Sequence, residues 1–295
     1  MFGMLAAAFI IGIAVAIPPG AVMISGSQRA ITRGFWDALA GTMTTDAFPK
    51  AATRQLVIDG TLITIAGMAK GAGMINPNMA TLLSYILTDV RIERLALQQV
   101  LEETLPDSFN AISVDGDTST NDTLLILANG VANNREVGRR GKSLTLFKQA
   151  VGEILRELAR LIVKDGEGAT RVVDIFVRGA KTTADAKKIA RSVAYSPLVK
   201  TAFFGGDPNW GRIVCAVGYA GAAVNIDTLD LTIGDVLIGK AGMSTGRESE
   251  KQAAQVMKQD EFSVTLDLHI GRGTAHVVTS DLSVGYVRFN SAYST

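Results

Sequence analysis

The chain has 295 residues, of which 29 are basic and 28 acidic, and this balance argues against a nucleic-acid partner. A single cysteine, Cys215, excludes an internal disulfide framework, and its apolar neighbours predict that it is a small core residue. Two histidines are too few for the usual zinc sites and disfavour a Ser-His-Asp triad. Any chemistry must therefore rest on hydroxyls, carboxylates, lysines, amides or the backbone.

The first 28 residues carry no charged side chain and are long enough for a transmembrane segment, although Pro18 and Pro19 would kink it. The stretch from Ala16 to Phe35 resembles the opening helix of the lysine-exporter type of amino-acid efflux proteins, but no second span follows. We therefore interpret residues 1–41 as a foreign head on a body of residues 42–295. Contact with a membrane is expected only if segment 1–28 is a genuine anchor.

The body begins with a predicted hairpin, because residues 55–65 alternate around Asp59-Gly60 with β-branched flanks. A loop with Gly71, Gly73 and Pro77 follows, and the chain becomes apolar directly after Thr81. Thr81 is thus a hydroxyl nucleophile at the point where a kinked loop enters a buried element.

This position suits a chain that cuts its own backbone. The Thr81 hydroxyl would attack the Ala80 carbonyl, the ester would hydrolyse, and Thr81 would become a new N-terminus. A free α-amine has a pKa of about 7.7–8.0, so it can act as the base for its own hydroxyl without a histidine. The alternative is an ordinary Gly-rich turn before a core strand.

The rest of the body mixes helices and strands. In segment 143–163, apolar residues recur at steps of three and four, which predicts an amphipathic helix. Thr183 is the expected N-cap of a helix that ends at Ser196-Pro197. Further elements are expected as helices at 92–103 and 248–259, a strand at 172–177, and a strand-rich tail from 229 to 287. This order predicts an α/β (α+β) fold of packed layers.

Three polar turns stand between these elements. Segment 115–123 fails as a calcium loop because its sixth and twelfth positions are Thr120 and Ile126, and we expect it instead to hold a structured turn near a site. Segment 164–170 places Glu167 on a Gly-flanked turn, either facing a cationic substrate group or simply solvated. Segment 205–212 is a third turn of unusual composition. No phosphate-binding motif indicates a nucleotide cofactor.

Taken together and in order, these motifs closely resemble the ornithine acetyltransferase / N-acetylglutamate synthase family of arginine biosynthesis. The resemblance covers about residue 42 to the end of the chain. It is carried by seven segments: Met43–Asp46, Ala69–Ile75, Pro77–Thr81, Asp115–Thr123, Asp165–Thr170, Gly206–Arg212 and Tyr286–Thr295.

The family resemblance implies an N-terminally truncated form of the layered αββα arrangement. It also implies self-cleavage between Ala80 and Thr81. Segment 42–80 would then be the remnant of a first chain and 81–295 the second chain, with the two remaining associated in an oligomer of heterodimers.

The implied reaction moves an acetyl group from N2-acetylornithine to glutamate through an acyl-Thr81 intermediate and gives ornithine and N-acetylglutamate. It needs neither cofactor nor metal, and acetyl-CoA is a possible second donor. The expected location is the cytoplasm. The family's substrate-binding positions map onto Thr44, Lys70, Thr81, Glu167, Asn290 and Thr295.

One family feature has no counterpart, since no Thr-Gly pair for an oxyanion hole stands upstream of Met43 in a matching context. Two alternatives therefore accompany the acetyltransferase hypothesis. One is an inactive, truncated remnant of that enzyme, and the other is a membrane-anchored exporter fusion.

Overall fold

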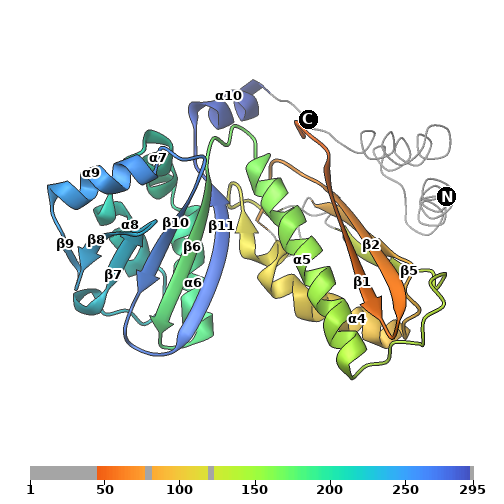
Figure 1. Ribbon diagram of the computed structural model, residues 1–295. Coiled ribbons are helices and arrows are strands. Elements are labelled where there is room, and N and C mark those ends of the chain that lie inside the picture. The colour runs from red at the N-terminus through yellow and green to blue at the C-terminus, as the bar shows by residue number, and fades with distance from the viewer. Residues whose placement is uncertain (1–44, 77–81, 119–122, 293–295) are drawn as a thin grey trace.

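In the computed structural model, residues 45–76, 82–118 and 123–292 are described, and they build two β-sheets (Figure 1). The first sheet has the strand order β1-β2-β3-β5, and the second the order β4-β11-β6-β10-β7-β8-β9. The first comprises β1 (Lys50–Ile58), β2 (Thr61–Lys70), β3 (Leu83–Thr88) and β5 (Thr123–Ala128). The second comprises β4 (Ile112–Ser113), β6 (Val172–Ala180), β7 (Asp230–Ile233), β8 (Val236–Lys240), β9 (Met243–Ser244), β10 (Glu261–Asp267) and β11 (Gly273–Ser280).

Helices pack against both sheets (Figure 1). The helices of the described residues are α4 (Arg94–Thr104), α5 (Lys142–Lys164), α6 (Thr183–Tyr195), α7 (Pro197–Gly205), α8 (Trp210–Gly218), α9 (Arg247–Val256) and α10 (Val284–Ala292). Short 3-10 turns lie at Leu105–Asp107, Phe109–Ala111 and Ile226–Thr228. The predicted layered α/β class is confirmed.

The hairpin predicted at the start of the body forms β1 and β2. Ile58 pairs with Thr61 across the turn, where Asp59 and Gly60 have φ angles of 49° and 80°. Two successive left-handed residues give the turn type whose twist matches the flanking strands. Strand β2 then pairs antiparallel with β3, and Lys70 lies opposite Leu83. The two ends of the connection between β2 and β3 are therefore neighbours.

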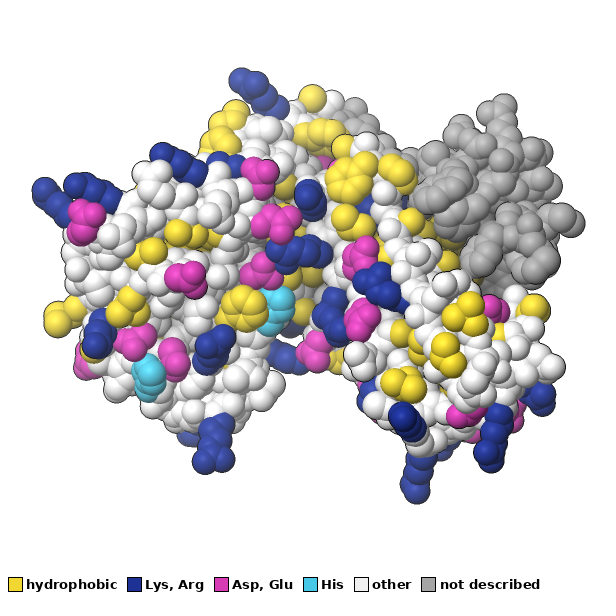
Figure 2. Space-filling model, viewed as in Figure 1, with side chains coloured by type: hydrophobic (Ala, Val, Ile, Leu, Met, Phe, Trp, Pro, Cys, Tyr) yellow, Lys and Arg dark blue, Asp and Glu magenta, His cyan; other side chains and the backbone are white. Residues whose placement is uncertain are grey.

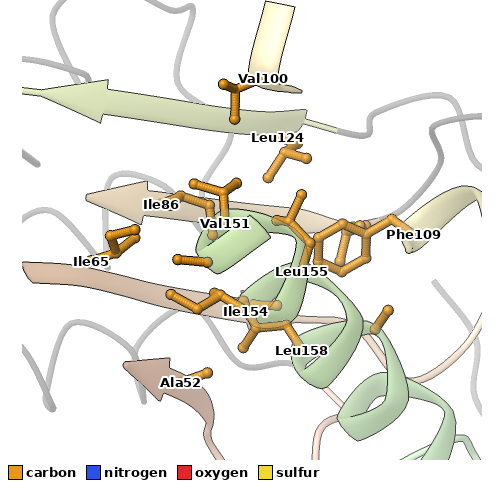
Figure 3. Close-up of a cluster of buried hydrophobic side chains, with 14 of the residues drawn as sticks. Ala52, Ile65, Ile86, Val100, Phe109, Leu124, Val151, Ile154, Leu155 and Leu158 are labelled. Carbon is orange, nitrogen blue, oxygen red and sulfur yellow. The ribbon is translucent and has the colours of Figure 1, made fainter. Parts of the chain in front are cut away.

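The first hydrophobic core lies between this sheet and the apolar side of α5 (Figure 3). Ile65 and Ile86 of the sheet and Ile154 and Leu158 of α5 are each 0% exposed. Burying one such side chain stabilises the fold by about 1.5–3 kcal/mol. The apolar spacing in segment 143–163 is thus what fixes the helix on the sheet.

A second core lies between α6 and the second sheet. Val173, Ile175 and Val177 point from β6 into a cluster with Ile189 and Val193 of α6. Strand β10 runs parallel to β6, whereas β11 runs antiparallel to it. Strand β6 therefore lies in the interior of the sheet, between β11 and β10.

Each sheet with the helices packed on it forms one half of the described structure. Helix α5 packs on the first sheet and also contacts the second, so it joins the two halves. Arg160 makes a two-pronged hydrogen bond to Asp174 of β6, at 3.0 and 2.9 Å, and one of 2.8 Å to Glu261 of β10. Charged side chains gather along the boundary between the halves on the face seen in Figure 2. These pairs are partly exposed, so they add specificity of packing more than stability.

The structure corrects three details. Thr182, not Thr183, caps α6, and its side chain accepts a hydrogen bond from the Asp185 N–H. Cys215 is exposed on α8 rather than buried, since that helix turns only its other side to the core. The strand-rich tail ends in a helix, α10.

Among the described residues, no helix combines the length and the apolar character needed to cross a bilayer. The head interpreted at residues 1–41, including the candidate segment 1–28, lies outside those residues.

Candidate active site

Three of the predicted site residues lie on elements that meet at one end of the first sheet. Lys70 is the last residue of β2, Glu167 is in the turn after α5, and Asn290 is on α10. The other predicted positions, Thr44, Ala80, Thr81 and Thr295, lie outside the described residues.

Glu167 and Asn290, 123 residues apart, are in direct contact. The Asn290 amide donates a hydrogen bond of 3.0 Å to the Glu167 carboxylate and another of 3.1 Å to the Tyr286 carbonyl. The second bond holds the amide within α10, and the first therefore orients the carboxylate. Glu167 is therefore not a freely solvated side chain, because its residue is half-buried and its carboxylate is held by a hydrogen bond.

The loop after Lys70 packs directly on Glu167. The Glu167 N–H donates to the Ala72 carbonyl at 2.8 Å, which fixes the two segments side by side. At Gly73 an added Cβ would lie 2.4 Å from the Glu167 carboxylate, so any other residue there would displace that carboxylate. Lys70 and Glu167 thus lie on neighbouring segments. We call the segment of Lys70 the cationic wall of the candidate site and the turn of Glu167 its anionic wall.

The polar turn from Asp115 onwards holds the far end of this loop. The Asp115 carboxylate accepts hydrogen bonds from the Met74 and Ile75 N–H groups at 2.6 and 2.9 Å. Asn76 donates to the Gly116 carbonyl at 2.8 Å and accepts from the Tyr195 hydroxyl at 2.5 Å. The described part of the turn is structured, as expected, and it braces residues 74–76. Its place near a site stays a prediction.

Burial dominates the electrostatics of the site. It lowers the pKa of Lys70; the nearby Lys50 lowers it further, and Asp46 opposes the shift. Burial also raises the pKa of Asp115, against the backbone N–H groups that stabilise its charge. The pKa of Tyr286 rises to about 12 through burial and the adjacent carboxylates of Asp115, Asp117 and Glu167. An excess of negative charge favours a cationic ligand group near Tyr286.

Several residues that shape this site were not predicted as site residues. Tyr286 and Asp115 lie inside motifs of the family resemblance. For Lys50 the only signal was its spacing of four residues from Asp46. Lys50 contacts Asp46 at 2.6 Å and Asp165 at 2.5 Å. Within the described ranges, no group of three or more His, Cys, Asp or Glu side chains could hold a metal ion.

Comparison with known proteins gives the context of this geometry. The model of the ArgJ family matches residues 11–295. This chain belongs to the ArgJ family. The exporter-like head predicted at residues 1–41 stays a prediction, and the family match begins inside that segment.

Two curated relatives illustrate the similarity of this ArgJ family member. The arginine biosynthesis bifunctional protein ArgJ of Geobacter sulfurreducens is 50% identical over 87% of this chain and 65% of its own length. The mitochondrial protein of that name from Schizosaccharomyces pombe is 44% identical over 91% of this chain and 63% of its own length. The chain therefore spans less than two thirds of these relatives.

A solved structure of clear sequence similarity supports the fold. The crystal structure of the arginine biosynthesis bifunctional protein from Bacillus halodurans superposes with a TM-score of 0.68 at 39% identity, over 71% of this chain and 98% of that chain.

Proposed function

We propose that this chain is an acetyltransferase that moves an acetyl group from N2-acetylornithine to glutamate through an acyl-Thr81 intermediate. The observation that carries the proposal is the pair of adjoining walls at the end of the first sheet. One wall offers the Lys70 ammonium, and the other offers Glu167 held by Asn290. The substrates named here have the charges that this pair would recognise.

Each group has a distinct partner in the proposed complex. N2-acetylornithine and glutamate both carry an α-carboxylate, which pairs with Lys70. The side-chain ammonium of the donor pairs with Glu167, whose carboxylate is oriented by Asn290. Glutamate lacks that ammonium, so the Glu167 contact selects the donor and the Lys70 contact serves both substrates.

The nucleophile arises by self-cleavage. The Thr81 hydroxyl attacks the Ala80 carbonyl and displaces the Thr81 nitrogen, which gives an ester. Water then hydrolyses the ester and leaves a carboxylate on Ala80 and a free α-amine on Thr81. In turnover the amine takes the hydroxyl proton as Thr81 attacks the acetyl carbonyl, and ornithine leaves with a proton on its α-nitrogen. Glutamate then takes the acetyl group from the ester.

One observation supports this role for Thr81. Leu82, which is bonded to Thr81, accepts a hydrogen bond from the Thr123 N–H and precedes the strand residue that pairs with Lys70. The nucleophile would therefore stand close to the cationic end of β2.

Intact mass and an exchange assay test the proposal together. Purified protein should contain a fragment that begins at Thr81, and it should move the acetyl group of N2-acetylornithine to labelled glutamate. Thr81→Ala should abolish cleavage and exchange, whereas Thr201→Ala, on an exposed position of α7, should change neither. A wild-type chain that stays whole and transfers no acetyl group would contradict the proposal and favour an inactive remnant.

Further properties follow as proposals. The relatives are named bifunctional proteins, which favours a second activity, and we infer that acetyl-CoA acetylates glutamate. The two cleaved chains would remain together in an oligomer of heterodimers in the cytoplasm. Native mass spectrometry and an assay with acetyl-CoA and glutamate alone would test these points, since monofunctional exchange leaves that pair unreacted.

A further inference from the structure

We propose that Lys50 is a positioning residue: its buried ionic bridge ties the segment that carries Lys70 to the segment that carries Glu167 and places Lys70 in one charge network with Asp46. The inference rests on the proposed function for the role of Lys70, but its geometry does not depend on it.

The bridge is closed off from solvent. Lys50, the first residue of β1, is 0% exposed, and its ammonium lies 2.6 Å from Asp46 Oδ1 and 2.5 Å from Asp165 Oδ2. The side chains of Asp46 and Asp165 are 0% and 2% exposed. Its charge also lies 5.3 Å from the centre of the Phe48 ring. A buried cation between two carboxylates is held in one place because any other position leaves a charge uncompensated.

Each carboxylate fixes one wall of the site. Asp46 accepts a hydrogen bond of 2.7 Å from the N–H of Gly71, the residue directly after Lys70. Asp165 ends α5 two residues before Glu167 and also accepts from the Ala47 N–H at 3.0 Å. The bridge therefore ties the end of β2 to the end of α5, across segments that are 115 residues apart from Lys50 to Asp165.

The same bridge reaches the Lys70 ammonium electrostatically. Among the described residues, the charged groups that act on Lys70 are Asp46, before β1, and Lys50, on β1. Asp165 is linked to Lys70 only through its ion pair with Lys50. Burial lowers the pKa of Lys70, Lys50 lowers it further and Asp46 raises it. Asp46 acts on the ammonium groups of both Lys50 and Lys70, so removing the charge of Lys50 should alter the pKa of Lys70.

A purely structural bridge and a positioning bridge predict different results. If Lys50 only stabilises the fold, its loss lowers the free energy of unfolding and leaves the titration of Lys70 in place. If it belongs to one charge network with Lys70, two substitutions should move that titration in opposite directions. Lys50→Met removes a repelling cation and should raise the pKa of Lys70. Asp165→Asn removes a compensating anion and should lower it.

Competitive labelling measures this in the whole chain. Trace acetic anhydride is applied at a series of pH values, and the acetylation of Lys70 is followed by peptide mass spectrometry. We expect its midpoint to shift by on the order of one pH unit, upwards for Lys50→Met and downwards for Asp165→Asn. Lys164→Met, which removes an exposed lysine next to Asp165, is the matched control and should cause no shift.

A midpoint that stays put, or that moves in the same direction in both variants, would overturn the proposal. If Lys50→Met does not fold, Asp165→Asn decides alone, because its amide is isosteric and still accepts from the Ala47 N–H. The readout needs only folded protein, so absence of acetyl exchange would count against the proposed function and not against this inference.

Discussion

Two buried lysines, one in each half of the molecule, have opposite surroundings. Lys50, at the site end of the first sheet, is 0% exposed between two carboxylates. Lys200, on α7 beside the second sheet, is 3% exposed and donates to the Thr279 hydroxyl at 3.0 Å and to the Ser280 carbonyl. Its hydrogen-bond partners are neutral, and burial lowers its pKa to about 7, against the more distant Asp281 and Asp115.

The difference shows what each half uses a lysine for. An ammonium between two carboxylates acts as an ionic clamp on the segments that carry them. An ammonium among neutral acceptors costs free energy to keep charged, so it loses its proton easily. The first half therefore fixes loops around a candidate site, whereas the second half accommodates a long side chain in its core.

Breaking the clamp should have the largest effect. Asp165→Ala leaves Lys50 with one carboxylate and the Ala47 N–H without its acceptor, and it should cost about 3–5 kcal/mol of unfolding free energy. Lys200→Met removes a cation that has only neutral acceptors, and it should cost no more than about 2 kcal/mol. Urea denaturation at pH 7 compares the two. A larger loss for Lys200→Met would reverse the comparison.

A pH series should sharpen the contrast. Burial lowers the pKa of Lys200 to about 7 in the folded chain, whereas in the unfolded chain the pKa returns to its ordinary value of 10.5. Between these values the unfolded state binds more protons, so stability rises with pH by up to about 1.4 kcal/mol per pH unit. Relative to Lys200→Met, the wild type should gain stability from pH 7 to pH 9 in urea titrations. Parallel curves would contradict this.

The anionic wall can be tested by selectivity. Glu167→Gln keeps the shape of the side chain but removes the charge proposed to pair with the donor ammonium. The loss should be about 1.5–3 kcal/mol, which raises the KM for N2-acetylornithine about tenfold to hundredfold. The KM for glutamate should change much less. Equal changes for both substrates would show that Glu167 does not discriminate between them.

The last comparison concerns the turn that carries Glu167. Gly168 has a φ of 68°, and an added Cβ would lie 2.2 Å from the Tyr286 nitrogen. Gly206, with a φ of 65° and nothing within 4 Å of such a Cβ, is the matched control. Ala at either position costs about 1–3 kcal/mol of backbone strain, and Gly168→Ala should cost more because it displaces α10. Thermal denaturation of the two variants would measure the difference, and equal costs would exclude the close approach.

Local patterns in the chain determined most of the secondary structure. The hairpin around Asp59-Gly60, the helix at 143–163 and the stop at Ser196-Pro197 were all readable, because turn residues and apolar periodicity act over a few residues. The motif order likewise identified the family and placed Lys70, Glu167 and Asn290 among the candidate site residues.

The tertiary structure alone decided how these pieces meet. The contact of Glu167 with Asn290, the brace of Asp115 on Met74 and the bridge from Lys50 to Asp165 each join segments at least 40 residues apart. No local period encodes such pairs, since they depend on which strand ends and helix ends the packed layers bring together. The exposure of Cys215 has the same origin: an apolar neighbourhood in sequence does not say which side of a helix faces the core.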